Sequence, residues 1–301
     1  MGNARWSDAD WQVHARATKS RSRSQIFTQS ELAPELNPAN IKYRESCDSQ
    51  LNPQSTPIIL GVDETGSMGV LAEIIIKEGL GTIMKAIYDR RPVTDPHILC
   101  MALGDAFTDT APLQVTQFEA SVEPLTNQVR KLYLEGNGGG NGGESYALAW
   151  LFAAAKTKCD AFKHGRKGFL FTIGDEAPHR TITRDQIQRF VGISVEKDME
   201  ARLLLESLKD DWHVLHLIVE TQSTKEQNAV HKWRELLGER AIVISEIERL
   251  AEVIVSLIQA IAGTNPDEIV QSWDEGAGKS VRGVFDQFIG WLKNEAVSSS
   301  R

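Results

Sequence analysis

Residues 57–69 read P57-I-I-L-G-V-D-E-T-G-S-M-G69, an apolar run that passes into a loop of acidic, hydroxyl and glycine residues. The run is short, rich in isoleucine and leucine, and shows little alternation, which is typical of a parallel strand buried on both faces. Polar residues directly after such a strand lie at the carboxyl edge of a sheet, where open α/β folds bind ligands. The stretch therefore predicts a fold class and also the place of a site.

Four further apolar runs of strand length follow, at residues 97–103, 168–173, 213–219 and 241–244. Helical periodicity fills the stretches around them, at residues 71–88, 145–156, 198–208, 225–237 and 247–261. Strands that alternate with helices predict an α/β protein. We expect a Rossmann-like, doubly wound and mainly parallel sheet with helices on both faces.

Composition divides the chain into three segments. Residues 1–55 are polar and rich in Ser, Arg, Pro and Asn, and we expect an extended N-terminal arm that packs along its own domain, in preference to a basic tail that docks on an acidic partner. A short helix is predicted within it, near residues 8–17. Residues 56–263 are expected to form the α/β domain, and residues 264–301 a C-terminal helical extension. Its stretch 281–293 is amphipathic and carries aromatic residues, so it is expected to dock on the domain.

Net charge, cysteine pattern and the length of apolar runs limit which partners and which cell compartment the sequence is compatible with. A net charge of −8 does not favour nucleic acid as a partner. Cys47, Cys100 and Cys159 form no metal-ligand or disulfide pattern, so free thiols in a reducing compartment are expected. No apolar stretch approaches the roughly 18–20 residues needed to cross a bilayer, and no secretory signal is recognisable. We therefore expect a cytoplasmic protein without a membrane partner.

The loop after the first strand fits two kinds of site. Gly61 and Gly66 have the spacing of a phosphate-binding loop, but Ser67 stands where such a loop needs Lys. The carboxylate of Asp63 would also repel phosphate. Asp63, Thr65 and Ser67 instead supply the oxygen ligands that Mg²⁺ (or Mn²⁺) prefers. The residues therefore favour a divalent cation over a nucleotide.

Further polar residues follow the other predicted strands and are expected at the same edge: Asp105, Asn141, Glu144, Asp175 and Glu176. Asp175 could bind a metal directly or through water. Asp105 has two interpretations, a group bonded to a metal-bound water or a turn cap. His179, in a loop, could line the crevice or be solvated, and we expect it to be solvated. His213 and His216 are expected in the core or at its edge and not as ligands.

Three stretches of the chain carry a family resemblance. D63-E-T-G-S-M-G69 resembles the metal-ion-dependent adhesion site (MIDAS) of von Willebrand factor A (vWA) domains, D-x-[ST]-x-S. G138-G-G-N-G-G-E144 resembles a GGGDxPE form of the second loop, with Asn141 in place of Asp. F171-T-I-G-D175 resembles the third loop. The resemblance covers about residues 58–262, and its flanking residues look like those of bacterial or phage members.

The resemblance implies a vWA fold in which Mg²⁺ (or Mn²⁺) is held by Asp63, Thr65, Ser67, Asn141 and Asp175. Asp105, Glu144 and Glu176 are alternative or indirect contributors, and the choice between Asn141 and Glu144 in the second loop stays open. The implied function is that of a metal-dependent adaptor that captures an Asp or Glu carboxylate of a protein partner. Association within the family suggests an AAA+ ATPase as one candidate partner.

Two other classes of function stay open at this point. The same crevice could serve a metal-dependent hydrolase or a nucleotide-binding enzyme. No catalytic constellation is evident, so we do not expect an enzyme. The chain could also be a structural component of a larger assembly, with the basic arm and the last helix as connectors.

Overall fold

The computed structural model describes residues 7–64, 79–135 and 142–298. Its strands are β1 (Arg44–Ser46), β2 (Thr56–Asp63), β3 (Pro96–Leu103), β4 (Leu113–Val115), β5 (Thr157–Cys159), β6 (Gly168–Gly174), β7 (Thr181–Ile182), β8 (Met199–Glu200), β9 (Trp212–Val219) and β10 (Ala241–Ile244). Its α-helices are α1 (Asp8–Lys19), α2 (Arg23–Ile26), α4 (Leu80–Arg90), α5 (Val122–Val129), α6 (Ala147–Lys156), α7 (Asp160–Lys163), α8 (Arg184–Gln186), α9 (Ala201–Leu208), α10 (Gln222–Glu226), α11 (Ala229–Leu237), α12 (Leu250–Ile261), α13 (Pro266–Gln271) and α14 (Glu275–Ser298). Short turns of other helical types are η1 (Pro38–Asn40), η4 (Ile187–Val191), η5 (Gly238–Arg240) and η6 (Ile247–Arg249).

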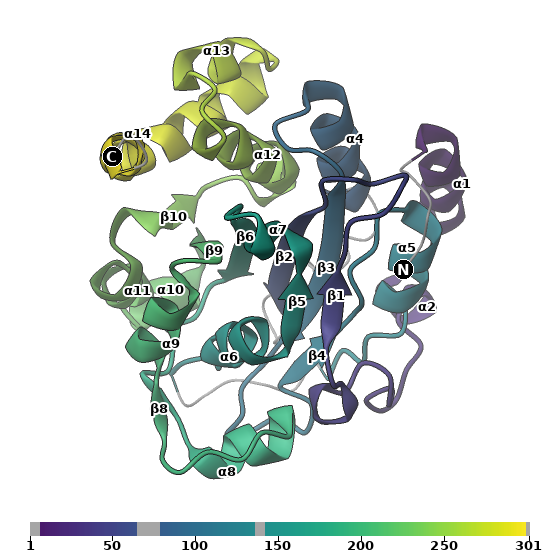
Figure 1. Ribbon diagram of the computed structural model, residues 1–301, viewed down its shortest axis with the longest axis vertical. Helices are drawn as coiled ribbons and strands as arrows, with labels where there is room; N and C mark the ends of the chain where they lie inside the picture. Colours follow the sequence, from purple (N-terminus) through teal and green to yellow (C-terminus); the bar gives the residue numbers. More distant parts are fainter. Residues whose placement is uncertain (1–6, 65–78, 136–141, 299–301) are drawn as a thin grey trace.

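Six strands form the central sheet in the order β10-β9-β6-β2-β3-β4 (Figure 1). The first five run parallel, and the short edge strand β4 runs antiparallel to β3. Val62 lies beside Ile173 and Asp63 lies beside Leu103, so β6, β2 and β3 end at the same edge of the sheet. The predicted doubly wound, mainly parallel α/β architecture is confirmed.

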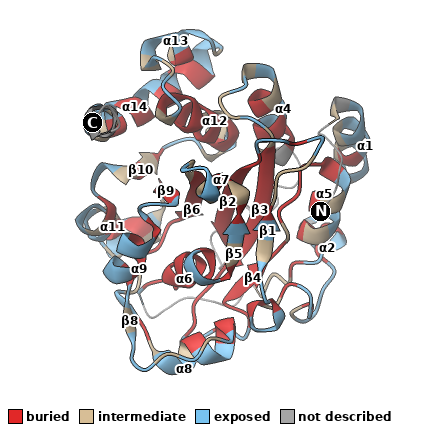
Figure 2. Ribbon diagram, in the orientation of Figure 1, coloured by how far each residue is buried: buried red, intermediate tan, exposed pale blue. Residues whose placement is uncertain are grey.

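Both faces of this sheet are covered by helices, and the central strands β2, β3 and β6 are buried throughout (Figure 2). Ile58 and Leu60 belong to one core together with residues of α4, α12 and α14. Ile59 and Leu170 belong to a second core, on the other face, with residues of α6, α9 and α11. Because alternate side chains enter two apolar layers, the strands show no polar alternation.

The N-terminal arm is docked on the α/β domain. Leu36 is fully buried, and β1 pairs in parallel with β5. The Lys156 ammonium, at the end of α6, donates to the carbonyl oxygens of Pro38 (2.8 Å) and Ile41 (2.7 Å). The arm therefore forms part of the cover of the core.

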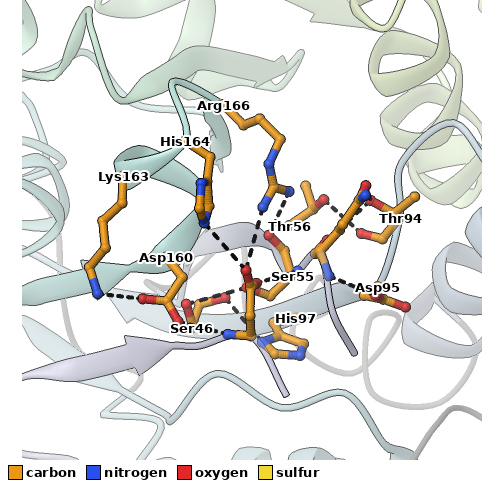
Figure 3. A network of polar contacts seen from close by, with 12 residues as sticks. Ser46, Ser55, Thr56, Thr94, Asp95, His97, Asp160, Lys163, His164 and Arg166 are labelled. Atoms are coloured by element: carbon orange, nitrogen blue, oxygen red, sulfur yellow. Dashed lines mark hydrogen bonds and ion pairs between the residues drawn. The ribbon is translucent and has the colours of Figure 1, made fainter. Parts of the chain in front are cut away.

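A polar network fixes the arm at the amino edge of the sheet (Figure 3). The Asp48 carboxylate accepts hydrogen bonds from the Ser55 N–H (2.8 Å) and hydroxyl (2.7 Å), and lies 3.8 Å from His164 Nε2. Ser46 Oγ lies 3.0 Å from His97 Nδ1. Both members of this Ser–His pair are buried, so a substrate has no access to it and its role is structural.

The C-terminal helix α14 packs against α12 and against the edge strand β10. Phe285 and Phe288 of α14 are buried in the core that α12 shares, which confirms the expected docking of residues 281–293. The Gln287 side-chain amide donates to the Val243 carbonyl and accepts from the Val243 N–H, both at 3.0 Å. One amide thus takes the place of a neighbouring strand and protects the edge of β10 from pairing.

Two predicted helices differ from those observed. The helix predicted over residues 225–237 is interrupted, because Asn228 adopts a left-handed conformation (φ 52°) between α10 and α11. The helix predicted over residues 198–208 begins only at Ala201, because Met199–Glu200 pair with β7 instead.

The helix predicted over residues 71–88 lies partly outside the described residues. Its described part, α4, begins at Leu80 and continues to Arg90.

Among the described residues, no helix combines the length and the apolar character that crossing a bilayer requires.

Candidate functional site

Seven carboxylates gather at the carboxyl edge of the sheet, and we call them the acidic cluster: Asp63, Glu64, Asp105, Asp109, Glu144, Asp175 and Glu176. They come from the ends of β2 and β6, from the loop after β3, and from the strap before α6. None of the seven residues is more than 8% exposed. Burying an ionised carboxylate is costly unless a positive charge or hydrogen bonds compensate for it. The cluster therefore needs compensation.

Asp63, at the end of β2, is oriented by a tyrosine that sequence reasoning missed. The Tyr146 hydroxyl donates to Asp63 Oδ2 at 2.9 Å, and both residues are fully buried. Burial, and then the nearby Asp63 charge, raise the pKa of Tyr146 well above its usual range, so it remains a donor. A Cβ at Gly174 would lie 2.0 Å from Tyr146 Oη and 2.9 Å from Asp63 Cβ. Only glycine at the end of β6 leaves room for this contact.

Contacts with two other aromatic rings hold Tyr146 in place. Its ring lies 5.0 Å from the rings of both His216 and Trp233. The latter two rings stack at 3.5 Å with an interplanar angle of 10°. Trp233 Nε1 donates to the Glu176 carbonyl oxygen at 2.9 Å. His216 is fully buried, as expected for a core residue, and it supports the site without contributing to it directly.

Glu144 is buried without a hydrogen-bond partner for its carboxylate. Its backbone N–H donates to the Ala177 carbonyl (2.9 Å), and its carbonyl accepts from the His179 N–H (3.0 Å). Within the described part of the chain, neither side-chain oxygen has a hydrogen-bond partner, although the residue is fully buried. Burial, and then repulsion by Asp63, raise the pKa of Glu144 to about 11. This carboxyl group requires either a proton or a cation.

Asp105, after β3, is held by two side chains. Its Oδ1 accepts from the Ser145 hydroxyl (3.1 Å) and lies 2.9 Å from His179 Nε2. The expectation that His179 is merely solvated is wrong: its side chain is 19% exposed and contacts Asp105. Gly143 permits this, because a Cβ there would lie 3.0 Å from His179 Cε1. The sequence separation of 74 residues between the two partners left no local signal for this contact.

Two further carboxylates of the cluster, those of Asp175 and Glu64, accept hydrogen bonds from neutral donors. Asp175 Oδ2 accepts from the Thr221 hydroxyl at 2.7 Å, so the loop after β9 also reaches the cluster. Gln114 Nε2 donates to a Glu64 carboxylate oxygen at 3.1 Å. Burial nevertheless raises the pKa of Glu64 well above its usual range, against the effect of Gln114. The neutral donor at Glu64 thus does not offset the cost of burying an ionised carboxylate.

The donor set of this edge suits a hard divalent cation. The structure brings Asp63, Asp105, Glu144 and Asp175 to one edge, whereas the predicted ligands Thr65, Ser67 and Asn141 lie outside the described residues. In residues 7–64, 79–135 and 142–298, no three His, Cys, Asp or Glu side chains converge closely enough to hold a metal ion alone. A metal site here would therefore also draw on hydroxyl or amide oxygens, which are ligands that Mg²⁺ accepts.

Removing the Tyr146 hydroxyl tests its role as the group that orients Asp63. We expect Tyr146→Phe to weaken Mg²⁺ binding by about ten-fold, because outer groups that orient metal ligands typically contribute 10–100-fold. The measurement is calorimetric titration of Mg²⁺ into metal-stripped protein.

Tyr43→Phe is the control, because Tyr43 is 37% exposed and its ring faces Lys158, outside the cluster. Equal Mg²⁺ affinity for Tyr146→Phe and the wild type would show that the hydroxyl does not orient a ligand.

Comparisons with known proteins do not assign a family. No family model matches this chain, and no curated protein matches its sequence. The pilus adhesin SpaC from Lactobacillus rhamnosus GG, in its open conformation, is similar with a TM-score of 0.49 at 13% identity. A von Willebrand factor type A structure from Catenulispora acidiphila is similar with a TM-score of 0.42 at 12% identity.

The alignments cover 71% and 70% of this chain, but only 31% of the adhesin chain and 44% of the second chain. The chain thus spans less than half the length of either protein. At such scores and identities the similarity carries no argument about function.

Proposed function

We propose that this chain is a vWA-like binding module that uses a divalent cation, Mg²⁺ or Mn²⁺, to capture a carboxylate of a protein partner. The observation that carries the proposal is the acidic cluster, with the fully buried Glu144 carboxylate that lacks a hydrogen-bond partner among the described residues. Its position at the carboxyl edge of a mainly parallel sheet is where this fold class binds ligands. The resemblance of residues 63–69 to a MIDAS motif supports the same assignment.

The cluster favours a cation over a nucleotide. Asp63 and Glu64 begin the loop that would have to surround a phosphate group, and both are buried. The Asp63 carboxylate would repel phosphate at the point where a phosphate-binding loop presents N–H donors. A divalent cation reverses the sign of this interaction and stabilises the same side chains.

Each residue then has a distinct part. Asp63 and Asp175, with Thr65 and Ser67, would hold the metal, and Asn141 or Glu144 would complete its ligands from the second loop. When bound, Mg²⁺ supplies a coordination position that a partner carboxylate can fill. Tyr146 keeps Asp63 in one orientation, and Thr221 does the same for Asp175.

The deciding experiment is calorimetric titration of Mg²⁺ and Mn²⁺ into metal-stripped protein, with and without ATP. We expect binding that does not depend on ATP and that weakens by more than about 100-fold in Asp63→Ala, because loss of a ligand exceeds the 10–100-fold effect of an outer group. Asp63→Asn removes the charge with little change of shape and should show the same loss. Far-UV circular dichroism should show that both variants keep the sheet, since Asp63 lies at a strand end.

Asp185→Ala is the control for a change of net charge, because Asp185 is 89% exposed and lies on α8. Unchanged metal affinity in both Asp63 variants would contradict the proposal. Metal binding that requires ATP, or hydrolysis of ATP that is lost in Asp63→Ala, would instead favour the enzyme alternative.

A further inference from the structure

A groove with a volume of about 450 Å³ opens beside the acidic cluster. Three segments line it: residues 178–180 before β7, residues 200–202 at the start of α9, and residues 232–236 of α11. β8, α9 and α11 lie on the same side of the molecule in Figure 1. The volume falls within the range of about 300–1,000 Å³ that is usual for ligand sites.

The groove carries an excess of positive charge. Arg180, Arg202 and Lys232 line it, together with the carboxylates Glu200 and Glu235. Arg180 lies 3.6 Å from Glu235, but this pair is exposed and therefore weak. Arg202 and Lys232 are exposed, and neither makes an ion pair with a described residue. Two cations thus remain available to an acidic ligand, in a chain whose net charge is −8.

One side chain separates this groove from the candidate metal site. His179 lines the groove, and its Nε2 lies 2.9 Å from Asp105 Oδ1 in the acidic cluster. The Phe107 ring lies 4.9 Å from the His179 ring and is 58% exposed. Leu203, directly after Arg202, is 57% exposed. Neither Phe107 nor Leu203 lines the groove, but each neighbours a residue that does, and exposed apolar side chains are features of surfaces that bind protein segments.

We infer that the groove receives an acidic segment of the protein partner. One carboxylate of that segment would go to the metal site, and a neighbouring carboxylate would bind between Arg202 and Lys232. Glu200 and Glu235 would repel a phosphate backbone that is charged at every unit, whereas a peptide can place its carboxylates beside Arg202 and Lys232 and uncharged residues beside the two glutamates. This inference rests on the proposed function and specifies the chemistry of the partner.

The test uses two synthetic fluorescein-labelled peptides and the full chain in Mg²⁺. One peptide alternates Glu and Leu, and the other has Gln in place of each Glu. By fluorescence anisotropy, we expect the Glu peptide to bind at least ten-fold more tightly than the Gln peptide. The double variant Arg202→Gln/Lys232→Gln should lose about ten-fold in affinity for the Glu peptide, whereas calorimetry should show no weaker binding of Mg²⁺.

Lys85→Gln/Lys209→Gln is the matched control, since both lysines are more than half exposed and lie outside the groove. Equal binding of the two peptides, no binding of the Glu peptide, or equal affinity of the groove variant and the wild type would overturn the inference while Mg²⁺ binding stands. Glu-selective binding that persists in EDTA and is lost in the groove variant would support the groove and contradict the metal-dependent function.

Discussion

Glu144→Gln is expected to stabilise the metal-free protein by about 3 kcal/mol at pH 7, a large effect for one substitution. The carboxyl group is fully buried without a hydrogen-bond partner among the described residues, and its pKa rises from 4.5 to about 11. At pH 7 the native state keeps the proton, whereas the unfolded chain releases it. Glutamine has the same shape and is neutral in both states, so it avoids this penalty.

The raised pKa of Glu144 also makes the free energy of unfolding depend on pH. Because the native pKa of Glu144 lies above its unfolded value, its contribution to stability is complete below pH 4.5 and is lost progressively as pH rises toward 11. The free energies of unfolding of variant and wild type should therefore converge near pH 4.5 and separate by pH 7. Urea unfolding in EDTA at both pH values measures the difference.

Glu196→Gln, at an exposed position, serves as the control and should show no such pH-dependent gain. A Glu144→Gln protein that is less stable than the wild type at pH 7 would mean that the carboxylate is ionised and compensated.

Mg²⁺ titration of the same variant tests whether Glu144 or Asn141 is the metal ligand of the second loop. Weaker binding would assign that role to Glu144, and unchanged binding would leave it to Asn141.

His213 is expected to make the protein sensitive to acid, with a loss of about 3 kcal/mol between pH 6.5 and pH 4. Burial, with repulsion by Lys167 and Arg240, lowers the pKa of His213 from 6.5 to about 4. Below pH 6.5 the unfolded chain binds a proton that the native state does not accept. Stability that is complete above pH 6.5 is therefore lost as pH falls through this window.

The measurement is urea unfolding of wild type and His213→Gln at pH 7 and pH 4. The decrease in the free energy of unfolding between these pH values should be smaller in the variant by about 3 kcal/mol. His213 lies near the start of β9, packed against the rings of Phe169 and Trp291, so the effect should not depend on metal. His231→Gln, on an exposed side chain, is the control. Identical pH dependence in His213→Gln and wild type would contradict the assignment.

Much of the fold follows from local pattern. Each of the five predicted apolar runs is a strand of the central sheet, because a strand buried on both faces must be apolar throughout. The strands that the pattern missed are short and depend on partners. β4 has three residues, and β1 exists only through pairing with β5. The break at Asn228 also has no signature in apolar periodicity, because only the backbone conformation changes there.

Some features of the candidate site also follow from the sequence, and others depend on tertiary packing. The sequence by itself determined that Asp63, Asp105 and Asp175 stand at the carboxyl ends of buried strands, because parallel strands all end at one edge. Only the tertiary structure decided their neighbours. Tyr146 meets Asp63 across 83 positions of the chain, and the docked loops bury Glu144 without a hydrogen-bond partner among the described residues. Strand ends follow from local periodicity, whereas side-chain contacts and burial depend on how distant segments pack.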